Sequence, residues 1–130
     1  MKAGKRSYFN VIGHLGDEEV GQLDYSKTAH YNNEVNQRHN KIFEIIGDGK
    51  CFGAFLVDKA HPNGNEIHLI FDNGIILILN ERTNKIITEL IARPAQIYRY
   101  WNSLNERFPM KYRYVIDKAK EHEEKGYNYW

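Results

Sequence analysis

Residues 66–101 read EIHLIFDNGIILILNERTNKIITELIARPAQIYRYW and hold three short apolar runs separated by two turn signals. Asn73-Gly74 separates the first two runs. This dipeptide between alternating apolar residues is typical of a β-hairpin, because both turn residues must accept positive φ. Glu81–Lys85 forms a longer second turn. The pattern then breaks at Pro94, which fits the first position of a helix because its missing N–H costs nothing there. The stretch therefore predicts an antiparallel β-meander that ends in a helix.

The meander is expected to contain four strands, one of them upstream of the quoted stretch. The predicted strands are Cys51–Val57, Glu66–Phe71, Ile75–Leu79 and Ile86–Ala92. The third is apolar on both faces, so it is expected to be the most buried, central strand. Strand alternation places His68 on the same face as Ile70, opposite Ile67 and Leu69. It places Thr88 on the same face as Ile86 and Leu90.

A helix is predicted on the N-terminal side of the meander. Asp24 or Ser26 can cap a helix across Lys27–Ile46. Its N-terminal half, KTAHYNNEVNQRHN, is very polar for a helix that docks on a sheet. That polarity indicates either a functional site or a helix end that overhangs into solvent. Further upstream, Tyr8–Leu15 alternates loosely and is a candidate strand.

Two helices are predicted after the meander, one from Pro94 and one across Met110–Lys125. The packing face of the first is predicted to carry Ile97, Tyr98 and Trp101. Its other side or margin is predicted to carry Gln96, Arg99 and Tyr100. The second is predicted to turn toward the core Tyr114, Ile116 and Ala119.

This order predicts an α+β fold, with an N-terminal helix packed on a four-stranded antiparallel β-meander and two C-terminal helices after it. At 130 residues the chain is expected to form a single domain, 1–130. Within it we distinguish an N-terminal extension (1–24) without a clear pattern, a core (25–105), and a C-terminal helix and tail (109–130).

Composition limits the classes of function. The formal charge is only +1, so a nucleic-acid role requires a local basic patch. The single cysteine, Cys51, excludes a disulfide framework and a multi-cysteine zinc site. No apolar run has the roughly 20 residues of a membrane span, and the N-terminus has no apolar signal-peptide core. We therefore expect a cytoplasmic protein without a membrane partner.

The polar residues favour chemistry that needs no metal or cofactor. No histidines and carboxylates occur at metal-ligand spacing, and there is no phosphate-binding glycine loop. In metal-independent RNA cleavage the substrate supplies its own nucleophile, the 2′-hydroxyl. The protein needs only a base, an acid and donors for the charged phosphorane. Candidates cluster in two places. The polar helix carries Lys27, His30, Arg38 and His39, and the strand-to-helix junction carries Arg93, Gln96, Arg99 and Tyr100.

Each candidate also has a purely structural interpretation. His30 also fits an exposed position on a helix. His68 also fits a half-buried position where its ring nitrogens have hydrogen-bond partners. Thr88 is an ordinary strand former. Arg93 is equally suited to a surface ion pair with Glu89, and Tyr100 to packing beside Trp101.

The order of a helix, a four-stranded meander and the string Thr88…Arg93-Pro94-x-Gln96-Ile97-x-Arg99-Tyr100 resembles the barnase/EndoU/colicin/RelE-like superfamily of small nucleases, common among phage proteins and toxins. Members place a histidine near the helix start, here His30, and a Ser or Thr on the last strand, here Thr88. The resemblance implies metal-independent cleavage of RNA, frequently tRNA. It also implies His30 as acid or base, Arg38 or Arg93 as phosphate clamp, and Thr88 as a donor to the phosphate.

A free-standing ribonuclease toxin would need an antitoxin or immunity partner.

Two other functions compete with a ribonuclease. The first alternative is a non-enzymatic, phage-encoded inhibitor on the same scaffold that binds a host protein or nucleic-acid complex. The nine tyrosines and the aromatic C-terminus favour it. The second is a plain nucleic-acid-binding module that uses tyrosine stacking and phosphate contacts, and the low net charge counts against it.

Overall fold

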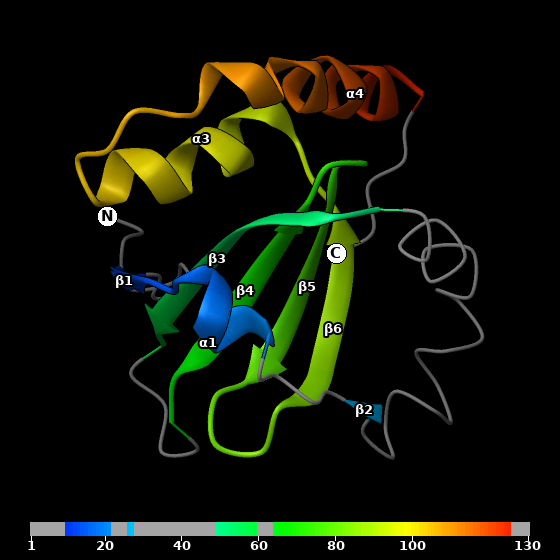
Figure 1. The fold of residues 1–130 in the computed structure, drawn as a ribbon. Coiled ribbons are helices and arrows are strands. Elements are labelled where there is room, and N and C mark those ends of the chain that lie inside the picture. Colours follow the sequence, from blue (N-terminus) through cyan, green and yellow to red (C-terminus); the bar gives the residue numbers. More distant parts are fainter. Residues whose placement is uncertain (1–9, 22–25, 28–48, 60–63, 126–130) are drawn as a thin grey trace, which may run out of the picture.

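The structure is a computed structural model that describes residues 10–21, 26–27, 49–59 and 64–125, with only the backbone at 26–27. Across these ranges the chain forms an α+β fold in which a six-stranded sheet carries helices at one end (Figure 1). The strands are β1 (Asn10–His14), β2 (Ser26–Lys27), β3 (Cys51–Asp58), β4 (Glu66–Phe71), β5 (Ile75–Asn80) and β6 (Lys85–Ile91). The helices are α1 (Asp17–Gly21), α3 (Pro94–Ser103), the 3₁₀ turn η3 (Met110–Tyr112) and α4 (Arg113–Glu124).

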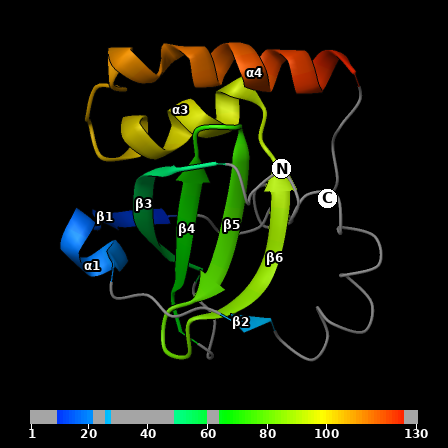
Figure 2. The same ribbon diagram turned by 45° about the vertical axis from the view of Figure 1, so that its right-hand side comes forward.

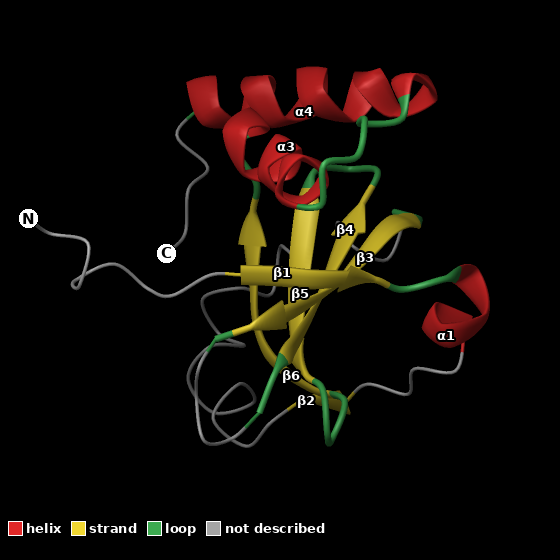
Figure 3. Ribbon diagram, turned by 90° about the vertical axis from the view of Figure 1, so that its left-hand side faces the viewer, coloured by secondary structure: helices red, strands yellow, loops and turns green. Residues whose placement is uncertain are grey.

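The predicted meander forms the centre of the sheet. Strand order is β1-β3-β4-β5-β6-β2, and β3 to β6 pair antiparallel with their sequence neighbours. The prediction of four strands was incomplete, because β1 adds antiparallel to β3 at one edge and the short β2 adds parallel to β6 at the other. β1 lies in the loosely alternating stretch 8–15. The sheet twists so strongly that β1 runs across the direction of β5 and β6 (Figure 3).

Both turns of the meander form where the sequence places them. In the first, Gly74 has a φ of +88°, whereas the φ of Asn73 is not positive. The Asn73 side-chain oxygen accepts the Ile75 N–H at 3.3 Å. The expectation that both residues take positive φ was therefore wrong. In the second turn the Asn80 side chain accepts the N–H groups of Arg82 and Thr83.

A β-bulge in β6 sets the orientation of Thr88. Ile78 pairs with Thr88, but Leu79 pairs with Ile86, so Ile87 is an extra residue. The extra residue turns Ile86 to the opposite face of the sheet, while Thr88 stays with Leu90. The prediction that Thr88 and Ile86 share a face was therefore wrong.

Each face of the sheet carries a hydrophobic cluster. The first, called here the helix face, carries Phe55, Ile70 and Ile76 in one cluster with Ile97 and Trp101 of α3 and with α4. The second carries Leu69, Leu77 and Ile91, with Leu15 and Val20 packed against it. Two helices side by side at one end of the sheet therefore cover only part of the helix face (Figure 2).

The orientation of α3 differs from the prediction. Tyr100 is 4% exposed and Tyr98 is 38% exposed, so the two tyrosines exchange their predicted roles. On α4, Tyr114 is likewise exposed, and the core contacts come from Val115, Ile116, Ala119 and His122. Tyrosine serves either position because its ring is apolar and its hydroxyl is polar.

Most of the predicted N-terminal helix lies outside the described residues. Its expected first residue, Lys27, lies in β2, so a helix start at that residue was wrong. Residues 28–46 lie outside the described ranges, and with them His30, Arg38 and His39. A short helix, α1, follows β1 in the stretch for which no helix was predicted.

Candidate functional site

A chain of three polar side chains connects the sheet to α3. The His68 ring on β4 lies between two oxygen atoms, with Nε2 2.9 Å from Glu66 Oε1 and Nδ1 2.7 Å from the Tyr100 hydroxyl. Glu66 and His68 are two residues apart on one strand, so their side chains share the helix face. Tyr100 reaches them from α3. We call this set the Glu66–His68–Tyr100 chain.

The partners fix the proton positions in this chain. An ionised carboxylate only accepts hydrogen bonds, so Nε2–H of a neutral His68 donates to Glu66 and Nδ1 accepts from the Tyr100 O–H. Burial lowers the pKa of His68, although the hydrogen bond to Glu66 opposes this effect. Burial raises the pKa of Tyr100 well above its usual value. At neutral pH the chain is therefore a neutral histidine between a phenol and a carboxylate.

Thr88 lies in the same row of the sheet as His68. The register pairs His68 with Ile78 on β5, and Ile78 with Thr88 on β6. Adjacent strands are about 4.8 Å apart, which places the two backbones about 10 Å apart. Thr88 is half-buried, and its hydroxyl donates a long hydrogen bond, 3.4 Å, to the Glu89 carbonyl. The helix face therefore carries the Thr88 hydroxyl two strands away from His68, with Ile78 between them.

Arg99 adds a positive charge next to Tyr100 on α3. Arg99 is exposed, and its charge acts on the Tyr100 phenol to lower its pKa, against the larger effect of burial. The guanidinium therefore lies within electrostatic range of the hydroxyl that holds His68. Of the predicted site residues, Thr88 and Tyr100 both turn toward the helix face, and Arg99 is the exposed residue next to Tyr100 on α3.

Arg93 and Gln96 lie at the other end of this region and have structural contacts. The Arg93 N–H donates to Gln96 Oε1 at 2.9 Å, so Gln96 caps the start of α3. The exposed Arg93 guanidinium lies 3.8 Å from Glu123 on α4. Glu89, the partner considered for Arg93 on the surface, is fully buried. Arg93 is five residues beyond Thr88, at most about 16 Å along the chain.

Lys27 is the predicted site residue that backbone pairing brings to β6. Its Cα pairs with Ile86, two residues before Thr88. His30 follows Lys27 by three residues in the sequence, and Arg38 by eleven, and both lie outside the described ranges.

Glu66 is the site residue that the sequence analysis missed. It begins a predicted strand, and its spacing of two from His68 places a carboxylate beside an imidazole on one face. That pattern was a usable signal, because buried histidines need partners for both ring nitrogens. Tyr100 as the second partner had no local signal, since it is 32 residues away from His68.

Among the described residues, no group of three histidine, cysteine or acidic side chains is arranged to hold a metal ion. None of the helices in the described part of the chain is long and apolar enough to cross a membrane. Comparison with known proteins finds no matching family model, no similar curated protein and no similar solved structure.

Proposed function

We propose that this protein is a metal-independent endoribonuclease, with RNA bound on the part of the helix face that α3 leaves open. The observation that supports this proposal most is the position of the half-buried Thr88 hydroxyl in the same row as the Glu66–His68–Tyr100 chain, with Arg99 on the adjacent flank. A hydroxyl donor and a guanidinium are the groups that stabilise a charged phosphorane. Transfer RNA is the substrate to test first.

The roles of Thr88 and Arg99 follow from the exposure of their side chains. Thr88 donates a hydrogen bond to a phosphate oxygen, and Arg99 neutralises its charge. The 2′-oxygen attacks phosphorus and the 5′-oxygen leaves, which yields a 2′,3′-cyclic phosphate and a 5′-hydroxyl. A base must take the proton of the 2′-hydroxyl, and an acid must protonate the 5′-oxygen. We assign one of these proton transfers to His30, whose ordinary pKa suits either role.

The Glu66–His68–Tyr100 chain is a positioning device in this proposal. His68 is 3% exposed and Tyr100 is 4% exposed, so neither reaches a bound phosphate directly. A phenol with a raised pKa is also a poor proton donor. By joining β4 to α3, the chain holds Arg99 at a fixed position relative to Thr88.

The proposal is tested by incubating the purified protein with total tRNA and messenger RNA in EDTA. We expect discrete cleavage products with cyclic phosphate ends, lost in Thr88→Ala and His30→Ala. The matched control is Thr83→Ala, since Thr83 is an exposed threonine in the turn before β6.

Two results would contradict the proposal. Cleavage that disappears in EDTA would show a metal-dependent reaction. Absence of cleavage by a protein whose thermal unfolding is cooperative would show that it is not a ribonuclease toward these substrates. If Thr88→Ala is as active as Thr83→Ala, the assignment of Thr88 to the site is wrong, although the proposed reaction is not contradicted.

A further inference from the structure

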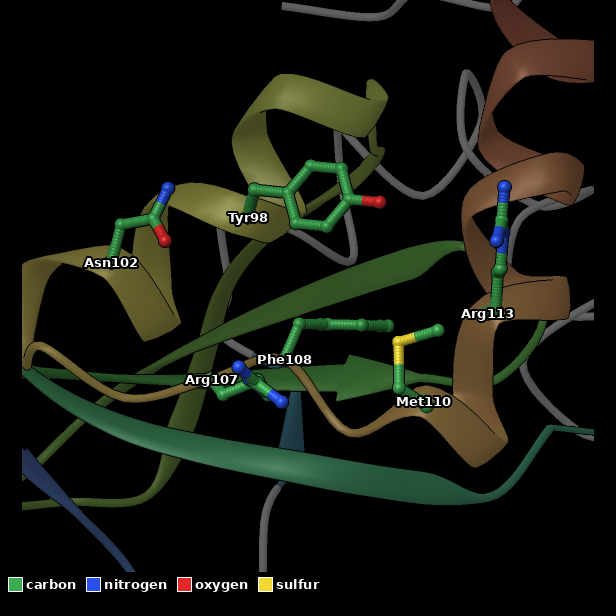
Figure 4. A pocket seen from close by; sticks show the side chains of 6 residues that line it. All are labelled: Tyr98, Asn102, Arg107, Phe108, Met110 and Arg113. Carbon is green, nitrogen blue, oxygen red and sulfur yellow. The ribbon is translucent and has the colours of Figure 1, made fainter.

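A pocket lies on the flank of α3 opposite Tyr100, where the chain turns from α3 through η3 into α4. Its volume is about 530 Å³, within the ~300–1,000 Å³ of small-ligand sites. The lining side chains are Tyr98, Asn102, Arg107, Phe108, Met110 and Arg113 (Figure 4). None of these residues belongs to the proposed cleavage site, so the pocket requires its own explanation.

The walls of the pocket combine an aromatic surface with apolar groups that remain exposed. Phe108 is 8% exposed, and Tyr98 meets it edge-to-face with ring centroids 5.4 Å apart. Tyr98 is 38% exposed and Met110 is 64% exposed. Figure 4 shows the Tyr98 ring extending from α3 toward the side where Arg113 projects from α4. A flat ring of this kind, held by a buried neighbour, is suited to stacking.

The charge around the pocket is positive. Arg107 and Arg113 are exposed and have no carboxylate partner among the described residues. Residues 102–113, which contain most of the lining residues, carry three arginines and lysines against one carboxylate, Glu106. That carboxylate is held by His14, with Nδ1 3.1 Å from Oε1. A chain of net charge +1 therefore concentrates cations at this position.

We propose that this pocket binds one nucleotide of single-stranded RNA. The base stacks on Tyr98 beside Met110, and the phosphate lies between the guanidiniums of Arg107 and Arg113. Arginine matches phosphate because its planar fork donates two parallel hydrogen bonds. The Asn102 amide both donates and accepts, as a base edge requires. An acidic polypeptide would use the arginines but would leave the exposed ring without a matching flat group.

The inference rests on the proposed function for the identity of its ligand, and it places a second contact for the RNA outside the cleavage site. Its test is separate from cleavage. We would measure fluorescence anisotropy with a fluorescein-labelled decamer of 2′-O-methyluridine in EDTA. This strand has no free 2′-hydroxyl within its chain and is not a substrate. An abasic phosphodiester of equal length is the second probe, and polyglutamate is the competitor.

We expect Tyr98→Ala to weaken decamer binding about 5- to 100-fold, the range for the loss of one base stack. Tyr98→Phe keeps the ring and is expected to bind as the wild type does. Arg113→Ala should weaken binding and lower the slope of log affinity against log salt by about 0.7. Lys120→Ala, an exposed cation of α4 outside the pocket, is the matched control for charge.

Several outcomes would overturn the inference. Equal affinity for the decamer and the abasic strand would exclude base stacking. Efficient competition by polyglutamate would favour an acidic protein partner. Equal effects of Arg113→Ala and Lys120→Ala would show non-specific attraction.

If Tyr98→Phe binds normally and Arg113→Ala does not, the proposal stands even where Tyr98→Ala fails to fold. Cleavage of tRNA without decamer binding would refute this inference alone, and binding without cleavage would refute the ribonuclease alone.

Discussion

The Tyr100 hydroxyl of α3 donates a hydrogen bond of 2.7 Å to Nδ1 of His68 on β4. Together with the buried Ile97 and Trp101, Tyr100 forms the face of α3 that packs on the sheet. With Tyr100 turned inward, Tyr98 is turned outward into the pocket, because residues two apart on a helix point in nearly opposite directions. The packing of α3 that this bond accompanies therefore places the Tyr98 flank in the proposed nucleotide pocket.

Tyr100→Phe removes the donor of this bond while keeping the ring. We expect the free energy of unfolding to fall by about 1–3 kcal/mol, the cost of leaving a buried acceptor without its partner. Urea unfolding monitored by tryptophan fluorescence measures the change. The control is Tyr98→Phe, which removes a hydroxyl from a more exposed ring of the same helix. Equal stability of the two variants would mean that the bond does not stabilise the docking of α3.

The lowered pKa of His68 predicts that acid destabilises the fold. Its pKa lies below 6.5 in the folded chain because the ring is buried. Between that value and pH 6.5 the unfolded chain binds more protons than the folded chain, so the free energy of unfolding decreases as pH falls. His122, whose pKa is also lowered by burial and by Lys118, contributes with the same sign.

The measurement is the midpoint of thermal unfolding between pH 7.5 and 5. We expect the midpoint to fall on acidification in the wild type and to fall less steeply in His68→Gln, whatever the stability of that variant at pH 7.5. Parallel curves for the two proteins would show that His68 does not titrate differently on folding.

Gly53→Ala tests how closely α3 approaches the sheet. A Cβ at Gly53 would lie 2.8 Å from a Trp101 ring carbon and 3.2 Å from a Phe55 ring carbon. Overpacking of this kind costs about 1–3 kcal/mol, and we expect a loss of that size in urea unfolding. Gly21→Ala is the matched control, since nothing lies within 4 Å of the added atom. A Gly53→Ala protein as stable as Gly21→Ala would show that the helix can move away at little cost.

The elements with strong local signals were the ones predicted correctly. Pro94 begins α3 as expected, and the turn at Asn73-Gly74 separates β4 from β5 where the sequence placed it. These signals depend on residues within a few positions of each other. β1 had only loose alternation, because its position is determined by pairing with β3 more than forty residues later.

The errors in side-chain orientation share one cause. The bulge at Ile87 and the choice between Tyr98 and Tyr100 both depend on partners in other elements. Periodicity alone treats both tyrosines as amphipathic and assumes an unbroken strand. Tyr100 faces the sheet, where it contacts the buried His68. His68 is 32 residues away, so the sequence of α3 alone does not indicate this contact.

Arg99→Ala and Arg93→Ala distinguish two positions for the phosphate clamp. Arg99 lies beside the Glu66–His68–Tyr100 chain, whereas Arg93 lies about 16 Å along the chain from Thr88 and close to Glu123. We expect Arg99→Ala to reduce the rate of tRNA cleavage in EDTA about 100-fold, as for the loss of one donor to a charged transition state. Arg93→Ala should retain most of the activity. Both are exposed arginines changed to the same residue, so each controls for the other. A larger loss in Arg93→Ala would place the clamp at the start of α3 and require a different arrangement of RNA on the helix face.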